Sequence, residues 1–317
     1  MGAAATPQVA GKVSSRAWTT PPTWVVMLAA LVGAGIGVAV LLFDWWWSWG
    51  PAARDLIHSS SFVLWASLIC AQTMLWTLAS FPVFATLRRH KKGWKGQRVD
   101  IVVSALILVG IVVAIVVVGN RLHRIPEVFP RSHPKVWTLT GIALLLALAA
   151  SISIWLIRGR LAELRAGAGK NELSLYIEFR GDLERLLGIL GAVVGLAVLA
   201  TAALRQVVLE YAASGHPNAD FPADYPILYG LILSLVLALI YLPTYLALLD
   251  AGSDLRRRAA PLPEPDDPGF EAAVAKRQTL TDLLGLDVSA STSFRAGVAI
   301  LSPLLGALVS LLPKLGG

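Results

Sequence analysis

The sequence predicts an all-α protein, a polytopic transmembrane helical bundle with six to seven spans and a cytoplasmic N-terminus. Two observations predict this fold class. Hydrophobic residues make up 56% of the 317-residue chain, and the charged residues gather between long apolar stretches. A helix of about 20 apolar residues crosses the hydrocarbon core of a bilayer, and a spanning segment must be helical because lipid offers its backbone no hydrogen-bond partners. A soluble domain rarely contains six helices that are apolar on every face.

Six apolar stretches meet this length criterion. They are residues 24–43, 61–87, 101–120, 136–157, 186–204 and 227–249. A seventh stretch, residues 294–312, carries Arg295 near its start and Pro303 in its middle. Its length is close to the lower limit, so a re-entrant segment is the alternative. We favour a span, because neighbouring helices can bond the carbonyl that a proline leaves unpaired.

The polar segments divide the chain into four parts. These are a polar N-terminal tail (1–23), the six-span bundle (24–249), a Pro-rich linker with a short helix (250–293) and the C-terminal hydrophobic segment (294–317). Between the fourth and fifth spans, we expect the helix to extend to Arg165, to break at the Ala-Gly-Ala-Gly-Lys sequence of 166–170, and then to resume. Residues 269–286 of the linker are long enough for one helix and too short for an independent core.

The distribution of Lys and Arg predicts the orientation. Nineteen of these residues lie in segments predicted to share one side of the membrane, and six lie in the loops of the other side. The richer set occupies residues 12–16, 88–98, 158–185 and 256–277. Cytoplasmic loops carry the excess of Lys and Arg, so we expect a cytoplasmic N-terminus. The bias toward Ala, Leu, Gly and Arg indicates a GC-rich bacterium, and the predicted location is the bacterial cytoplasmic (inner) membrane.

A basic cluster between the second and third spans predicts contact with anionic lipid headgroups. It contains Arg88, Arg89, Lys91, Lys92 and Lys95. Each Lys or Arg near the membrane surface contributes roughly 1 kcal/mol to such binding, so the net charge of +7 does not require nucleic acid as a partner. The linker at 250–293 is a candidate docking element for a cytoplasmic partner protein.

No motif for catalysis, cofactor binding or metal binding is recognisable. The spans carry no ionisable residue near their middles, although intramembrane proton relays and ion-coupled transport depend on such residues. Cys70 is the only cysteine of the sequence, and the Cys and His residues do not have zinc spacing. We therefore expect a protein that is not an enzyme and has no cofactor.

Small and polar side chains form one stripe along the second span. Its members, at intervals that keep them on one helical face, are Ser59, Ala66, Cys70, Thr73, Thr77 and Ser80. Trp65 and Trp76 fall on the opposite face, which we expect to meet lipid. The stripe either lines a water-filled path or allows close packing against another helix, and the residue types favour packing.

Two other spans carry glycines at the spacing that lets helix backbones approach closely. On the first span these are Gly33 and Gly37, and on the fifth they are Gly188, Gly191 and Gly195. We expect these faces to pack against other helices, either within the chain or in a homo-oligomer.

The sixth span presents small and aromatic polar residues on one face. They are Gly230, Ser234, Ala238, Tyr241 and Tyr245. A tyrosine hydroxyl at that depth needs a hydrogen-bond partner, so this face should point inward. It is the best candidate in the sequence for lining a cavity.

Three classes of function are consistent with these patterns. The first, which we favour, is a channel-like or membrane-permeability component, an oligomer in which the polar stripes line a path. The second is a structural or signalling subunit that docks partner proteins. The third is a transporter or an enzyme for a lipid-like substrate, with polar groups from His58, His123, Arg124 and His133. A pore requires the stripe of the second span to face a symmetry axis, whereas a partner-binding subunit would bury it.

Overall fold

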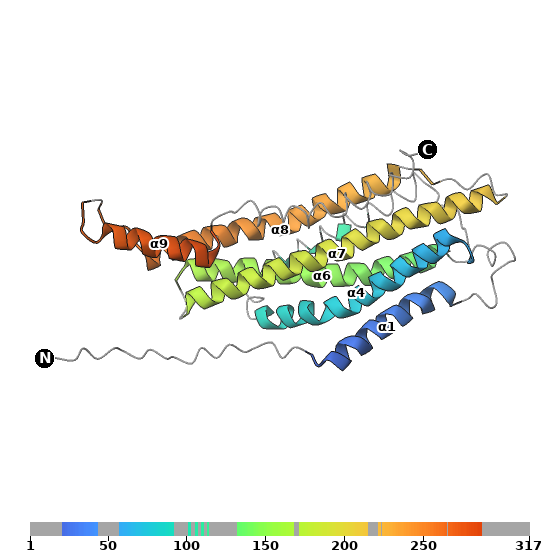
Figure 1. Ribbon diagram of the computed structural model, residues 1–317, viewed down its shortest axis with the longest axis horizontal. Helices are drawn as coiled ribbons and strands as arrows, with labels where there is room; N and C mark the ends of the chain where they lie inside the picture. Colours follow the sequence, from blue (N-terminus) through green and yellow to red (C-terminus); the bar gives the residue numbers. More distant parts are fainter. Residues whose placement is uncertain are drawn as a thin grey trace.

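The computed structural model describes residues 21–43, 57–91, 132–167, 171–214, 224–264 and 266–286, together with 101–102, 105–106, 109–110, 113 and 221–222. Within these ranges the chain has six helices and no strand (Figure 1). The helices are α1 (Thr23–Leu42), α4 (Ser60–His90), α6 (Ser132–Arg165), α7 (Glu172–Ala213), α8 (Asp224–Ala259) and α9 (Phe270–Leu284). The predicted all-α fold is confirmed for this part of the chain.

Five of the described helices, all except α9, are long and apolar enough to cross a membrane. This finding is compatible with a multi-pass membrane protein. These helices coincide with the first, second, fourth, fifth and sixth predicted spans. The predicted span at 294–312 and most of the one at 101–120 lie outside the described residues. The total number of spans and the side of the N-terminus therefore stay predictions.

Several helices continue far beyond their apolar segments. α7 has 42 residues, which makes it about 63 Å long at 1.5 Å per residue, whereas the hydrocarbon core is about 30 Å thick. The continuation is rich in Arg, Glu and Leu, which favour helix. The predicted extension to Arg165 is confirmed, as is the helix predicted within 269–286, which is α9.

α9 ends in a tight turn that directs the chain back toward α8. Gly285 has a φ of +58°, and only glycine adopts this left-handed conformation without steric cost. The N–H of Gly285 donates to the carbonyl of Asp282, and the N–H of Leu286 donates to the carbonyl of Thr281, both at 3.0 Å. These bonds satisfy carbonyls at the end of the helix and bring Leu286 against Gly252 of α8.

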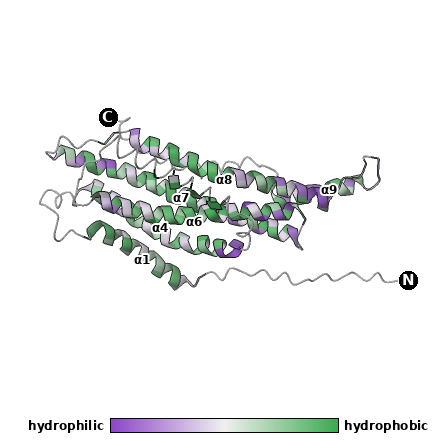
Figure 2. Cartoon of the chain, turned by 180° about the vertical axis from the view of Figure 1, so that it is seen from behind, coloured by the Kyte–Doolittle hydropathy of each residue, from purple (hydrophilic) through white to green (hydrophobic). Residues whose placement is uncertain are grey.

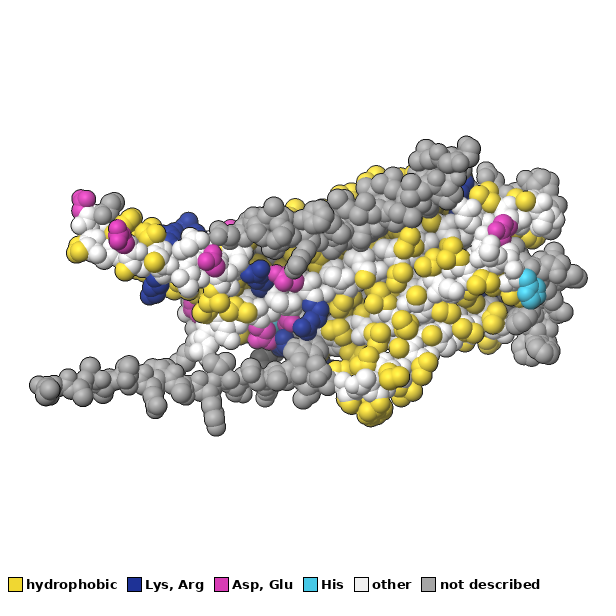
Figure 3. All heavy atoms as spheres, viewed as in Figure 1, with side chains coloured by type: hydrophobic (Ala, Val, Ile, Leu, Met, Phe, Trp, Pro, Cys, Tyr) yellow, Lys and Arg dark blue, Asp and Glu magenta, His cyan; other side chains and the backbone are white. Residues whose placement is uncertain are grey.

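α4, α6, α7 and α8 form the central bundle, and α1 lies outside it against α4 (Figure 1). We call the end at which α4 and α8 finish and α7 begins the α9 end, because α9 lies there, and we call the other end the opposite end. Figure 2 shows hydrophilic residues concentrated at the α9 end and hydrophobic ones along the rest of the bundle. Space-filling side chains show the same division, with acidic and basic groups gathered near α9 (Figure 3).

Along its outer side, α8 exposes a continuous row of leucines. Each is about half exposed or more, and the row comprises Leu228, Leu231, Leu235, Leu239, Leu242 and Leu246. An apolar surface of this length is unusual on a soluble monomer and is typical of a face that meets lipid or another protein. The inner side of α8, with Leu237 and Leu248, is buried against α6 and α7.

Candidate functional site

The predicted stripe of α4 packs directly against the glycines of α1. A Cβ atom at Gly33 would lie 2.7 Å from the Cα of Met74, and one at Gly37 would lie 2.6 Å from Oγ1 of Thr73. The Thr77 hydroxyl is 3.0 Å from the carbonyl oxygen of Ala29 in α1. Close backbone approach over small residues, with a hydroxyl bridging the helices, is the arrangement expected of tight packing in membranes. We call this contact the α1–α4 seam.

The members of the stripe differ in their surroundings. Thr73 is 2% exposed, and its hydroxyl donates to the carbonyl of Ile69 in its own helix at 2.9 Å. Cys70 is half-buried beside Gly37. Ser80 donates to the carbonyl of Thr77, and Ser59 caps α4 by accepting the N–H of Phe62 at 3.1 Å. Cys70, Thr73 and Thr77 thus lie in the seam. That the stripe lines a path stays a prediction.

The expectation that Trp65 and Trp76 face lipid is wrong. Their exposed fractions are 2% and 4%, and both point into the bundle. α4 is covered on two sides, because α1 takes its small-residue face while α6 and α7 pack against the others. A helical wheel separates the two faces of α4, but it does not show how many neighbours the helix has.

The predicted polar face of α8 lies inside the bundle. Gly230, Ser234 and Tyr241 are buried, and the rings of Tyr241 and Tyr245 stack with centroids 5.5 Å apart. The Ser234 hydroxyl is buried and has no hydrogen-bond partner within the described residues. These side chains fill the contact of α8 with its neighbours, and whether they line a path stays a prediction.

The glycines of α7 do not share one environment. Gly191 is buried and Gly195 is half-buried, whereas Gly188 is exposed. A Cβ atom at Gly188 would meet nothing within 4 Å. Gly188 therefore makes no close contact with the described residues of its own chain, because the buried side of α7 at this level is formed by Leu186, Leu187 and Leu190. Whether Gly188 packs in a homo-oligomer stays a prediction.

A buried carboxylate joins α4 to α7 at the α9 end. Asp182 is 4% exposed. Its Oδ2 accepts from Nη1 of Arg89 at 2.8 Å and lies 3.1 Å from Nε2 of His90. Arg89 also pairs with Glu178 at 2.9 Å, and His90 meets the ring of Phe179 edge-on. Moving a charge from water into a protein interior is costly, and contacts with charged partners offset part of that cost.

Further polar contacts at the same end link the remaining helices. Arg165 of α6 pairs with Asp254 of α8 at 3.1 Å, and Arg258 of α8 pairs with Glu172 of α7 at 3.2 Å. Together with the Asp182 cluster, these pairs form what we call the ionic layer. The sequence showed acidic residues interleaved with arginines around 178–185, but it did not show which helix supplies each partner.

α9 docks onto α7 and α8 through its last turn. Arg180 of α7 donates to the carbonyl of Leu284 at 2.9 Å, and Arg256 of α8 donates to the hydroxyl of Thr281 at 3.0 Å. Beneath this turn is Tyr176, which precedes the predicted fifth span. Its side chain is buried, and this burial raises the pKa of its hydroxyl to about 12. The hydroxyl therefore stays neutral and packs against Gly252.

Gly252→Ala is expected to loosen α9. The new Cβ would lie 2.6 Å from both the Tyr176 hydroxyl and Cδ2 of Leu286, and overpacking of this kind typically costs 1–3 kcal/mol. Tryptic cleavage at Lys276 should become about tenfold faster, since about 1.4 kcal/mol changes an opening equilibrium tenfold. Gly181→Ala, where a Cβ meets nothing within 4 Å, is the matched control. Equal cleavage rates in the two variants would contradict the tight contact at Gly252.

The basic cluster at the end of α4 is divided between two roles. Arg88 and Lys91 are exposed, while Arg89 is engaged by Asp182 and Glu178. Lys92 and Lys95 lie outside the described residues. Arg89 is thus a structural residue of the ionic layer, and binding of lipid headgroups by the others stays a prediction.

The opposite end is closed by separate contacts. Lys135 is 6% exposed and donates to the carbonyl of Leu41 at 2.8 Å, where the end of α1 favours a cation. Ser61 donates to a carboxylate oxygen of Glu210, which joins α4 to α7. Of the polar residues suggested for a lipid-like substrate, His58 is exposed here; the side chains of His123, Arg124 and His133 lie outside the described part.

A search of the described residues for a metal site gives a negative result. No group of three His, Cys, Asp or Glu side chains in this part of the chain could hold a metal ion. Comparison of the chain with protein-family models, with curated proteins and with solved structures finds no match.

Proposed function

We propose that this chain is a multi-pass protein of the bacterial cytoplasmic membrane that acts as a non-catalytic structural or signalling subunit. Its N-terminus and its α9 end lie in the cytoplasm, because the segments at that end hold most of the Lys and Arg residues. The membrane part is a closed bundle, and the α9 end docks a partner protein.

The observation that carries this proposal is the α1–α4 seam. The channel-like function that the sequence suggested depends on the stripe of α4 being available to line a path. Thr73 and Thr77 instead face Gly37 and Gly33 of the same chain, at distances that leave no room for water. The stripe is therefore used for packing within the monomer, which is the arrangement expected of a partner-binding subunit.

The shape of α9 supports a docking role. Only its last turn is buried, at Thr281 and Leu284, whereas Val274 and Leu283 are 42% and 51% exposed. Arg180 and Arg256 hold the last turn of α9 against α7 and α8, so the exposed part is presented from a fixed support. An immobilised helix with exposed apolar positions can dock a partner at a smaller entropic cost than a mobile segment.

Thiol accessibility distinguishes a closed bundle from a channel. Thr73→Cys and Thr77→Cys, each combined with Cys70→Ala, are reconstituted in liposomes and treated with a water-soluble, membrane-impermeant thiol reagent. We expect both positions to be protected, because the seam is dry, and we expect no protein-dependent ion flux. Gln278→Cys, on an exposed part of α9, is the positive control for labelling. Labelling at both stripe positions together with ion flux would support the channel instead.

Site-specific photo-cross-linking tests the docking role. A photoreactive amino acid replaces Val274 or Leu283 on α9, and in parallel it replaces Leu235 or Leu239 on the leucine row of α8. In native membranes, the α9 positions should give a discrete protein adduct that the α8 positions do not give. The adduct should also weaken in a Gly252→Ala background, in which α9 is loosened. Protein adducts of the same size at both sets of positions would contradict a docking role for α9.

A further inference from the structure

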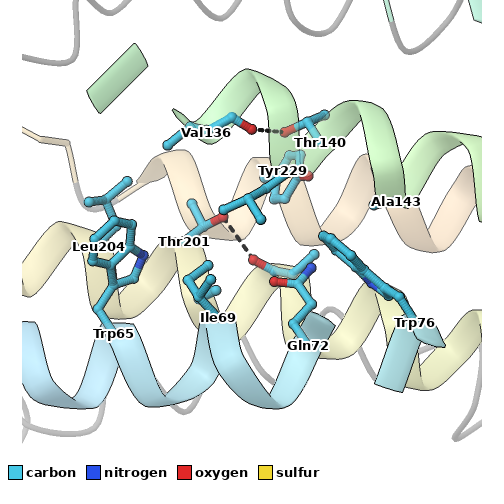
Figure 4. Close-up of a pocket in the computed structure, with 13 residues that line it drawn as sticks. Trp65, Ile69, Gln72, Trp76, Val136, Thr140, Ala143, Thr201, Leu204 and Tyr229 are labelled. Atoms are coloured by element: carbon cyan, nitrogen blue, oxygen red, sulfur yellow. Dashed lines mark hydrogen bonds between the residues drawn. The ribbon is translucent and has the colours of Figure 1, made fainter. Parts of the chain in front are cut away.

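A cavity of about 90 Å³ lies between α4, α6, α7 and α8 in the half of the bundle nearest the opposite end (Figure 4). Its polar and aromatic lining consists of Trp65, Gln72, Trp76, Thr140, Thr201 and Tyr229. Four helices therefore contribute to one small space. The seam with α1 is on another face of α4, so this cavity is separate from the stripe discussed above.

Two buried polar side chains in the cavity wall carry N–H donors that have no acceptor in the described part of the chain. Gln72 is 5% exposed, lies between the rings of Trp65 and Trp76 in Figure 4, and makes no hydrogen bond to the rest of the described chain. The Nε1 of Trp76 is buried and likewise has no partner there. A buried indole N–H normally finds an acceptor, and an unmet donor costs about 1–3 kcal/mol. Both groups therefore favour an acceptor supplied from outside the chain.

The hydroxyl groups of the two threonines in the cavity wall already donate hydrogen bonds to backbone carbonyls of their own helices. Thr140 donates to the carbonyl of Val136 at 2.8 Å, and Thr201 donates to that of Ala197 at 2.9 Å (Figure 4). The N–H groups of Gln72 and Trp76 are thus the available donors among these four side chains. None of the described residues that line the cavity is charged, and an ion at this depth would be costly without a counter-charge. The lining therefore selects an uncharged group with hydrogen-bond-accepting oxygens.

A second cavity of about 100 Å³ adjoins the first and shares Thr140, Ala143, Ala197 and Tyr229 with it. The other described residues of its wall are almost wholly apolar. They include Leu190, Val194, Leu233, Leu237 and Ile240. A polar compartment followed by an apolar one matches the two parts of an amphiphile, because hydrocarbon is stabilised when it leaves water or polar surroundings for an apolar space.

We propose that these two cavities bind one uncharged lipid whose carbonyl oxygens accept hydrogen bonds from Gln72 and Trp76 and whose hydrocarbon chain occupies the apolar cavity. Two kinds of membrane lipid carry such carbonyls, neutral glycerolipid esters and quinones. This site is independent of the docking role of α9, since its lining and the docking turn share no residue.

The test measures ligand-induced thermal stabilisation of the purified full chain in detergent. The probes are dioctanoylglycerol, a short-chain quinone, and octanoate as a charged comparison. A ligand that binds the folded state raises the melting temperature in a saturable manner. Saturation by dioctanoylglycerol or by the quinone identifies the source of the carbonyl group, and octanoate should have no effect. Absence of a saturable shift with both neutral probes would overturn the proposal.

Three variants locate the effect. Gln72→Leu replaces the amide by an apolar side chain of similar size, and Trp76→Phe keeps an aromatic ring, although a smaller one. Each removes a donor, so each should weaken binding about tenfold. Gln278→Leu and Trp155→Phe, which lie outside both cavities, should bind as the wild type does. Ala143→Leu fills the junction of the cavities and should abolish the shift while preserving the melting temperature of the unliganded protein. Unchanged binding in all three cavity variants would overturn the site.

Discussion

Gly33→Ala should separate α1 from α4 and lower the free energy of unfolding by roughly 3 kcal/mol, the upper part of the usual range for overpacking. The added methyl group would meet backbone atoms, since a Cβ at Gly33 lies 2.7 Å from the Cα of Met74 and from the carbonyl oxygen of Thr73. Backbone cannot rotate away as a side chain can. The helices must therefore move apart, and the bond from Thr77 to Ala29 would be lost with them.

Gly35→Ala is the matched control, because it adds the same methyl group two positions along α1. A Cβ at Gly35 meets nothing within 4 Å, and alanine is a better helix former than glycine by up to about 1 kcal/mol. The two variants should therefore change stability in opposite directions. Unfolding by sodium dodecyl sulfate in mixed micelles, followed by circular dichroism, measures both. A loss of similar size in the two variants would show that α1 is sensitive to any added volume and not to contact with α4.

The apolar segments could be predicted from the sequence because their signal is local. α1 begins at Thr23 and ends at Leu42, within one residue of the predicted first span. The length of a run of apolar residues shows whether a helix can cross the hydrocarbon core of a membrane. The residues that follow Ile157 extend the helix because they have high helix propensity. Neither inference requires knowledge of which helices are neighbours.

The environment of each helical face could not be predicted, because it depends on neighbours that are distant in sequence. Trp65 and Trp76 occupy a distinct face of α4, yet that face meets α6 and α7 instead of lipid. Gly188 has the spacing of a packing glycine, but its side of α7 is exposed. The partners of Asp182 are Arg89 and His90, more than 90 positions away, and spacing within one helix carries no information about them.

Asp182→Leu should destabilise the protein by about 3–5 kcal/mol, the cost observed when one member of a buried ion pair is removed. Asp182 is 4% exposed and contacts both Arg89 and His90, so its loss removes the more buried of the two carboxylates that pair with Arg89. Glu163→Gln breaks an exposed pair with Arg160 and should cost less than about 1 kcal/mol.

The cause of this loss can be isolated by removing the charge of Arg89 as well. Replacement of a buried ion pair by apolar residues is often neutral, because the desolvation cost disappears with the attraction. The double variant Arg89→Met with Asp182→Leu should therefore recover most of the stability that Asp182→Leu loses, as measured by the same unfolding assay. A double variant as unstable as the single one would indicate that the shape of Asp182, and not the charge of Arg89, determines the stability of the α4–α7 contact. Recovery would instead show that the loss arises from the charge of Arg89 that remains when Asp182 is removed.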